Sequence, residues 1–483
     1  MSRTSQLRRW SPQFILLGAV GLAYLNAFQG AFQFDDYNVI VDNRLVHSWA
    51  AWAGDLPQGI RPLLKASYTL NWTSGLGLFG FHLVNLLIHA ANVLLVFSLS
   101  KRFLEGSGSL RSDLATRAAL LTALLFALHP IQTEAVTYIS GRSTSLMTLC
   151  YLGSLLAYVR GVETGRGLWL YGLSPLLFLC GLATKEVAVT LPAALLLWEL
   201  VGPAVRPPWR TILQRQAVHW TLLGVSFAVL LLHSRYEWLL TFSLGVRTLG
   251  DNLLTQVHGI TYLLSRLVWV HRLNIDPDLP VITQWTGRLA MEAGGLALLL
   301  ALGLANLRRR PWLAFGILWL FLHLLPTNSI LPRLDVANER QLYLPGWGIF
   351  LGIGVLLVKL RERAIPSPSP VPGPGLFEFE RSMAGPVLTV GLVVLLGVMT
   401  VARNQVYRSE IALWEDTAAK SPQKARVYNN LGYAYYLAGR HAKAREAYET
   451  ALRLDPRFEL AGNNLLSLDA KAMALVQPAL ANP

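Results

Sequence analysis

Polar clusters at alternate breaks between apolar segments are the feature that most constrains this chain. Four such clusters occupy residues 34–48, 129–142, 184–186 and 326–340. A bilayer core requires about 20 mostly apolar residues for each crossing helix, and successive crossings end on opposite sides. If the apolar segments cross one after another, all four clusters lie on one side. Ionisable groups gathered in this way mark a functional site more often than a packing accident.

The composition indicates a polytopic membrane protein with a small soluble part. Hydrophobic residues make up 53% of the 483 residues and charged residues 14%, whereas soluble proteins average about 25% charged. The net charge of +14 is explained by Lys and Arg that hold cytoplasmic loops in place. Nucleic-acid binding would need a clustered basic face, which is not visible. Cys150 and Cys180 lie in apolar segments and predict neither a disulfide nor a thiolate metal site.

The apolar segments predict an all-α bundle with about eleven crossings. They lie near residues 13–33, 81–100, 115–130, 143–160, 168–184, 186–201, 217–234, 286–306, 311–327, 341–358 and 384–402. A further apolar helix at 252–271 is predicted to be interfacial or re-entrant on the outer side, because only then does Arg308–Arg310 fall in the cytoplasm. This topology places an uncleaved first crossing after a cytoplasmic N-terminus, and the C-terminal region outside.

The chain is predicted to divide into a transmembrane domain at 1–403, a repeat region at 404–475 and a tail at 476–483. Within the first domain, residues 34–80 form the first outer loop, and residues 364–380 form a Pro-rich cytoplasmic linker. The repeat region contains a tetratricopeptide pattern at 425–458. Its small residues let two helices cross closely, and helices are expected on both sides of it. Because fewer than three full repeats are marginal alone, we expect this region to dock on the outer loops or the membrane domain.

Two adjacent carboxylates, Asp35 and Asp36, directly follow the first apolar segment. A carboxylate can act as a general base or hold a divalent cation beside a phosphate. The alternative is that both acids only end a helix at the membrane surface, where water solvates them. We favour a catalytic role, because two carboxylates with further polar residues behind them exceed what a helix end needs.

Two cations are candidates to bind a phosphate on the same side. Lys185 stands between two apolar segments and could hold a phosphate as a point charge; a tight turn with an ion pair to Glu186 is the alternative. Arg340 could donate two hydrogen bonds to phosphate oxygens; the alternative is an arginine that snorkels at a helix end.

Further polar residues are predicted to line the same cavity. They are Glu134, His129, Arg142, Glu186, Glu339 and Arg61. Glu134 and Arg142 could instead pair with each other. His82, Asn85 and His89 share one helix face, where interhelical hydrogen bonding is favoured over metal binding. No convincing metal-ligand spacing, phosphate loop or serine elbow is present in the sequence.

The order of these motifs resembles the transmembrane-and-tetratricopeptide proteins of the C-type glycosyltransferase superfamily. FDDYNVIVDN, the run beginning RPLLKASYTL, LLFALHPIQTEAVTYISGR, LATKEVAVTLP and NERQLYLP precede the repeat in that order. The resemblance implies transfer of a sugar from a polyprenyl-phosphate carrier to an acceptor on the outer face, which in eukaryotic relatives is a protein hydroxyl receiving mannose. It also implies that Asp35 and Asp36 match the acidic motif that serves the reaction. Basic residues on outer loops would meet the lipid phosphate, and Lys185 and Arg340 are the candidates by position.

One departure from the family pattern concerns the residues after Gly141–Arg142. An acidic residue is expected there, but Ser143 and Thr144 occupy the positions, so no acid role is assigned to them. The predicted partners are a polyprenyl-phosphate-linked sugar and a protein acceptor held by the repeat region, with a divalent cation as an optional cofactor. Short loops and a short repeat array favour a bacterial inner membrane. The alternative functions are a non-enzymatic scaffold that recruits a partner through its repeats, and a transporter of lipid or solute.

Overall fold

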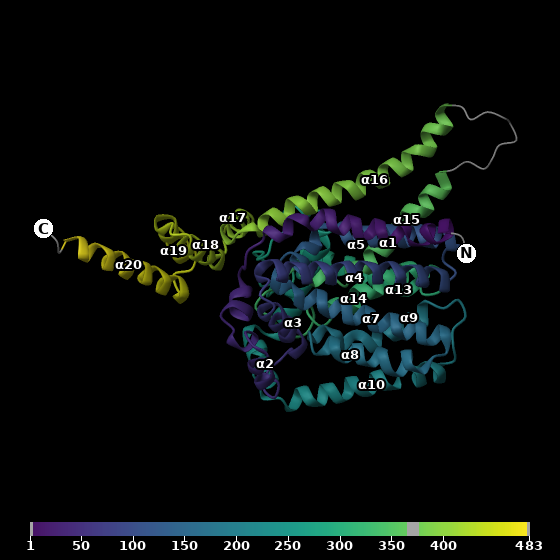
Figure 1. Cartoon of the computed structure of the whole chain (residues 1–483), viewed down its shortest axis with the longest axis horizontal. Coiled ribbons are helices and arrows are strands. Elements are labelled where there is room, and N and C mark those ends of the chain that lie inside the picture. Colours follow the sequence, from purple (N-terminus) through teal and green to yellow (C-terminus); the bar gives the residue numbers. More distant parts are fainter. Residues whose placement is uncertain (1–2, 365–375, 481–483) are drawn as a thin grey trace.

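The computed structural model describes the backbone of residues 3–364 and 376–480, and the side chains of residues 11–363 and 387–469. All regular structure in these ranges is helical, and most helices lie side by side in one bundle (Figure 1). The bundle helices are α1 (Arg3–Tyr24), α4 (Gly77–Gly106), α5 (Ser112–Leu128), α7 (Arg142–Thr164), α8 (Ser174–Leu182), α9 (Leu191–Val201), α10 (Trp209–Leu232), α13 (Gly287–Ala305), α14 (Pro311–Leu324), α15 (Gly346–Ala364) and α16 (Leu376–Asn404).

Six helical segments in the described part of the chain are long and apolar enough to cross a membrane. They are Ser11–Gln29, Gly77–Gly106, Ile139–Thr164, Trp209–Leu232, Gly287–Ala305 and Val387–Arg408. The pair Ser112–Leu128 and Pro130–Val136, bent by 54°, would make a seventh. Leu168–Leu182 and Pro311–Leu324 are shorter apolar helices. The chain is therefore an all-α integral membrane protein, as predicted, while the count of about eleven crossings remains a prediction.

The segments between the long helices contain more structure than the sequence indicated. Loop 34–80 carries α2 (Trp49–Asp55) and α3 (Pro62–Thr73), and α11 (Ser234–Val246) follows α10 after a break at His233. The apolar segment at 186–201 divides into the 3-10 helix η7 (Glu186–Thr190) and α9. Pro192 stands in the first turn of α9, where a missing N–H is tolerated and a new helix can begin.

The helix predicted at 252–271 is α12 (Leu249–Arg266), and it carries buried amides on one face. The Asn252 side chain donates to the carbonyl of Ser329 at 2.7 Å, and the Asn328 side chain donates to Gln256 Oε1 at 2.9 Å. Since buried polar groups require partners, α12 is fixed against the segment that follows α14. This contact holds the 326–340 cluster in place.

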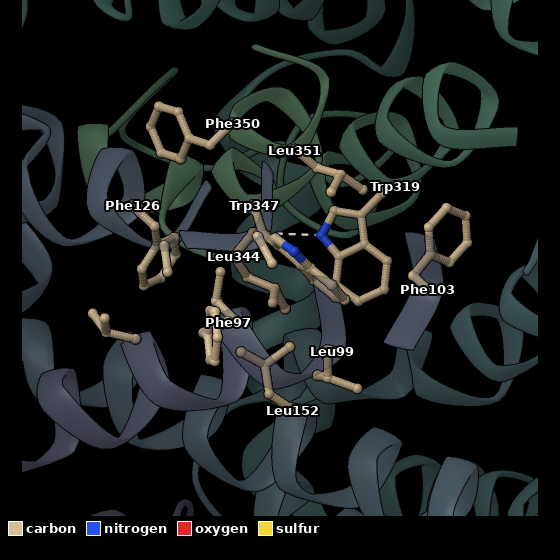
Figure 2. Packing of buried hydrophobic residues seen from close by; sticks show 14 of the residues in the cluster. Phe97, Leu99, Phe103, Phe126, Leu152, Trp319, Leu344, Trp347, Phe350 and Leu351 are labelled. Atoms are coloured by element: carbon tan, nitrogen blue, oxygen red, sulfur yellow. Dashed lines mark hydrogen bonds between the residues drawn. The ribbon is translucent and has the colours of Figure 1, made fainter. Parts of the chain in front are cut away.

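The centre of the bundle is packed with aromatic side chains (Figure 2). Trp319 of α14 donates from its indole nitrogen to the carbonyl of Leu344 at 2.9 Å, and its ring meets Trp347 at 4.5 Å. Gly316 of α14 and Gly348 of α15 allow the backbones of these two helices to touch. A side-chain carbon at either position would lie 2.5 Å from the carbonyl oxygen of the other, so only glycine fits there.

The repeat region begins where α16 ends. Figure 1 shows α16 leading to α17 (Glu410–Lys420), beyond which α18 (Ala425–Leu437), α19 (His441–Leu454) and α20 (Glu459–Leu480) project from the bundle. Lys424 and Arg426 both bind the buried carboxylate of Asp276, at 2.5 Å for Lys424 Nζ and 2.9 Å for Arg426 Nε. The start of the repeat region is thereby docked on the membrane domain. Residues 365–375 of the predicted linker and 481–483 of the tail lie outside the described residues.

Candidate active site

The four polar clusters meet at one end of the bundle, which we call the polar end. Two hydrogen bonds join three of them: Ser140 N–H to Asp36 Oδ1 at 2.8 Å, and Arg340 N–H to Glu134 Oε2 at 2.9 Å. In the fourth, Lys185 Nζ donates at 2.7 Å to Oγ1 of Thr144, two residues beyond the 129–142 cluster. The loop helices α2 and α3 lie at this end as well, and α17 begins there (Figure 1). Residues far apart in the sequence are thus brought into one site.

Asp36 is fully buried, and both of its carboxylate oxygens are engaged. Oδ1 accepts from the N–H and the hydroxyl of Ser140, and Oδ2 accepts from the N–H of Gln33 at 3.0 Å. Burial raises the pKa of Asp36 to about 7, although these hydrogen bonds favour the carboxylate. An acid held in this way fixes the loop around it and has no free oxygen for a substrate.

Asp35 faces the opposite way. Its backbone N–H donates to the hydroxyl of Tyr138 at 2.9 Å, and its side chain is 38% exposed. Its Oδ2 lies 3.8 Å from Nη2 of Arg340, whose guanidinium also lies over the ring of Tyr138. Of the two predicted carboxylates, Asp35 is therefore the one that a substrate can reach.

The polar end also holds strained backbone. Phe34 (φ 47°) and Arg61 (φ 55°) are the non-glycine residues with positive φ in the described chain. Such conformations cost on the order of 1–3 kcal/mol, persist only where surrounding contacts hold them, and gather at functional sites. Phe34 directly precedes the two acids. Arg61 donates two hydrogen bonds to Glu186, from Nε at 2.9 Å and from Nη2 at 2.7 Å.

The cations of the polar end fall into two groups. Arg61 is paired with Glu186, and Arg340 has its Nε 3.5 Å from Oε1 of the buried Glu134. Neither Lys185 nor Arg333 forms an ion pair with the described side chains. Burial, followed by the charges of Arg340, Arg61 and Arg333, holds the pKa of Lys185 well below its usual value. Lys185 and Arg333 thus lack a carboxylate partner among the described side chains, and a bound anion would favour the charged form of Lys185.

Arg333 and Tyr138 also lie in this site, although the sequence did not single out either residue. Both belong to predicted polar clusters, so their side of the membrane followed from the same alternation. Nothing in the sequence distinguished Arg333 from a helix-end anchor, or Tyr138 from an interfacial aromatic. Their contacts with the site depend on how the loops fold.

Arg142 does not join this site. It is fully buried and donates to side-chain oxygens of Asn85 and Asn71, each at 2.6 Å, and to the carbonyl of Phe81 at 2.8 Å. It makes no pair with Glu134, which contacts Arg340 instead. Arg142 therefore ties loop 34–80 to α4 and α7, and we do not count it among the residues that line the cavity.

His129 and Glu339 lie beside the cation group. His129 donates from Nε2 to the carbonyl of Leu267 at 3.0 Å and lines an apolar groove of about 560 Å³. The groove runs between α12, α13, α14, α15 and α16. Glu339 is buried, accepts from the N–H of Asn274, and lies 3.9 Å from Arg403 at the end of α16. His129 thus belongs to the groove, and Glu339 to the junction with the repeat region.

The predicted metal role finds no ligand set. No group of three or more His, Cys, Asp or Glu side chains suited to a metal ion occurs among the described residues. The two adjacent acids point apart, and Asp36 is saturated by N–H and O–H donors. Among the described residues, these side chains as arranged do not supply the ligands that a divalent cation requires.

The sequence is similar to one protein family and to several known proteins. The tetratricopeptide repeat family matches residues 425–458, which are α18 and α19, and confirms that prediction. Protein O-mannosyl-transferase TMTC1 of Mus musculus is 25% identical over 94% of this chain and 59% of its own length, and the Homo sapiens protein of that name is 26% identical over 94% and 56%. Protein O-mannosyl-transferase F38B6.6 of Caenorhabditis elegans is 24% identical over 92% and 63%.

The similarity covers most of this chain but not most of its relatives. The chain spans 56–63% of the length of these three proteins. The identity is low, yet the match runs through the transmembrane domain as well as the repeat. The chain is therefore a distant homologue of the TMTC protein O-mannosyl-transferases that carries a tetratricopeptide repeat.

Proposed function

We propose that this protein transfers mannose or another hexose from a polyprenyl-phosphate donor to a protein hydroxyl on the extracytoplasmic face of the membrane. The observation that carries the proposal is an accessible carboxylate, Asp35, at the same end of the bundle as the unpaired cations Lys185 and Arg333. The names of the relatives, protein O-mannosyl-transferases, support the same reaction class.

The reaction needs one base and one anion site. Asp35 takes the proton of the acceptor hydroxyl as the oxygen attacks the anomeric carbon. The bond from that carbon to the phosphate oxygen breaks, and the bonding electrons leave with the polyprenyl phosphate. Lys185, Arg340 and Arg333 stabilise the growing negative charge of the leaving phosphate. A single displacement of this kind inverts the anomeric carbon.

A lipid-borne donor suits the location. Sugar nucleotides are cytoplasmic, so an outer-face transferase requires a sugar that has crossed the membrane on a lipid. The apolar groove has a volume of about 560 Å³, which could hold part of an isoprenoid chain, and its lining includes His129, five residues before Glu134 in the chain. The acceptor would be bound by the repeat helices α18 and α19.

The proposal requires one orientation of the protein in the membrane. With about eleven crossings of a bacterial inner membrane, the N-terminus lies in the cytoplasm, and the polar end and the repeat region lie on the extracytoplasmic side. Single cysteines at exposed positions such as Asn38 and Arg308 test this in intact cells. A membrane-impermeant maleimide should label the first position and not the second. Labelling of Arg308→Cys alone would reverse the orientation and remove the proposed chemistry.

The activity test uses the full chain in lipid nanodiscs with polyprenyl-phosphate mannose and an acceptor polypeptide. Mass spectrometry should detect a hexose on the acceptor. Asp35→Asn should lower kcat by about 100-fold or more, as loss of a general base does. Asp42→Asn, an exposed acid of the same loop, is the matched control and should retain turnover. A folded Asp35→Asn protein with full turnover would refute the base assignment.

A further inference from the structure

The first helix of the repeat region contacts the loop that carries the acids. The backbone N–H of Phe34 donates to Oε1 of Glu410 at 3.1 Å. The Phe34 ring packs edge-on against Trp414, with centroids 5.2 Å apart and planes at 81°. Glu410 and Trp414 are both on α17, so one helix holds both the backbone and the side chain of Phe34.

A second bond ties the neighbouring residue to the segment before α17. Gln33 donates from Nε2 to the carbonyl of Tyr407 at 2.5 Å, and its own N–H donates to Asp36. Gln33 is therefore bonded both to Tyr407 and to Asp36, and Phe34 is bonded to Glu410. These contacts join positions about 375 residues apart in sequence.

The backbone conformation of Phe34 makes these contacts consequential. Its φ of 47° is unfavourable for a bulky side chain and requires external support. The turn at this residue sends Asp36 into the protein and Asp35 towards Arg340. If the support were removed, Phe34 would relax towards an extended conformation, and Asp35 would move with it.

We propose that Glu410 and Trp414 are positioning residues for Asp35, so that α17 completes the catalytic centre. This inference rests on the transferase function proposed above. Under it, the repeat region is more than an acceptor-binding appendage, because its first helix sets the geometry of the base. Acceptor capture by α18 and α19 and proton transfer at Asp35 are then linked through α17.

The kinetic test compares three variants of the full chain in nanodiscs. Glu410→Ala removes the acceptor of the Phe34 N–H, whereas Glu410→Gln keeps a side-chain oxygen that can accept it. Glu415→Ala is the matched control, because Glu415 on the same helix binds Tyr435 within the repeats. Glu410→Ala should lower kcat about 10- to 100-fold with the donor KM unchanged, as displaced catalytic groups do. Glu410→Gln and Glu415→Ala should remain within about threefold of the unmodified protein.

A spectroscopic test separates this inference from the proposed function. A spin label at the exposed position Asn38, in a Cys150→Ala, Cys180→Ala background, reports on the loop without any substrate. Its spectrum should become more mobile in Glu410→Ala and stay unchanged in Glu410→Gln and Glu415→Ala. If the unmodified protein transferred no sugar, the proposed function would fall, and the label would still decide whether α17 holds the loop. An unchanged spectrum in Glu410→Ala, or an unchanged kcat in an active protein, overturns the proposal.

Discussion

The two ends of α14 carry basic residues in contrasting surroundings. At its start, Arg308, Arg309 and Arg310 are exposed, where water solvates their charges. After its end, Arg333 and Arg340 lie partly or largely buried among the loops of the polar end. Solvated arginines suit an anchoring role at a membrane surface, whereas buried cations without a full set of partners create a site for an anion. Under the proposed function, the same residue type would anchor the membrane domain at one end and bind the donor phosphate at the other.

The largest expected effect concerns the buried arginine that is fully partnered. Arg142→Leu would leave the buried side chains of Asn71 and Asn85 without their donor, and should lower the free energy of unfolding by about 3–5 kcal/mol. Thermal unfolding in detergent and the yield of folded protein measure this. Arg142→Leu with unchanged stability would mean that loop 34–80 is held by its apolar contacts alone.

The next effect sharpens the distinction between paired and unpaired cations. Lys185→Gln and Arg333→Gln should each weaken binding of the lipid phosphate about 10-fold, which is about 1.4 kcal/mol. Each substitution is combined with Asp35→Asn, and the affinity for polyprenyl phosphate is measured in these inactive proteins, so that binding is separated from catalysis. Because these cations also stabilise the charge that grows on the leaving phosphate, each substitution by itself should lower kcat as well as weaken donor binding. Equal binding by all of these proteins would remove the anion site from the polar end.

A pH dependence follows from Asp36. Its pKa rises on folding from the ordinary value of about 4 to about 7, so the folded protein holds this proton more tightly than the unfolded chain. The resulting stability is fully present below about pH 4 and is lost as pH rises through about 7. Relative to Asp36→Asn, the native protein should lose about 1.4 kcal/mol per pH unit over this interval. Parallel unfolding curves across this range would contradict the raised pKa.

The smallest effect on stability and donor binding is expected at the exposed arginines before α14. Arg309→Gln should change both the free energy of unfolding and the donor KM by less than about 0.5 kcal/mol, as is usual for surface positions. Thermal unfolding and donor titration measure it beside Arg333→Gln. A loss at Arg309 as large as that at Arg333 would erase the contrast between the two ends.

Much of this arrangement could be predicted from the sequence, because alternation of crossings is a strong constraint. It places the loops of Asp35, Glu134, Lys185 and Arg340 on one side before any contact is known. The all-α membrane architecture and the repeat at 425–458 followed from apolar length and residue spacing, and both are confirmed.

What could not be predicted depends on local backbone and on remote contacts. The left-handed turn at Phe34 determines which of Asp35 and Asp36 is exposed. A bulky residue such as phenylalanine rarely adopts this conformation, so the sequence did not predict the turn. The surroundings of Arg142 depend on how α3 and α4 fold against it. The contact of Glu410 with Phe34 joins residues 376 positions apart, and a short sequence motif cannot predict a contact over that separation.

The glycine pair in the bundle has a consequence for any lipid that enters the groove. Gly316 and Gly348 touch backbone to backbone, and both also line the groove. At that point the wall is main chain, and no change of rotamer can widen it. Under the proposed function, a hydrocarbon tail in the groove would have to adopt the contour that the two helices impose, so that selectivity among lipids would begin with the shape of the chain before its head group is bound.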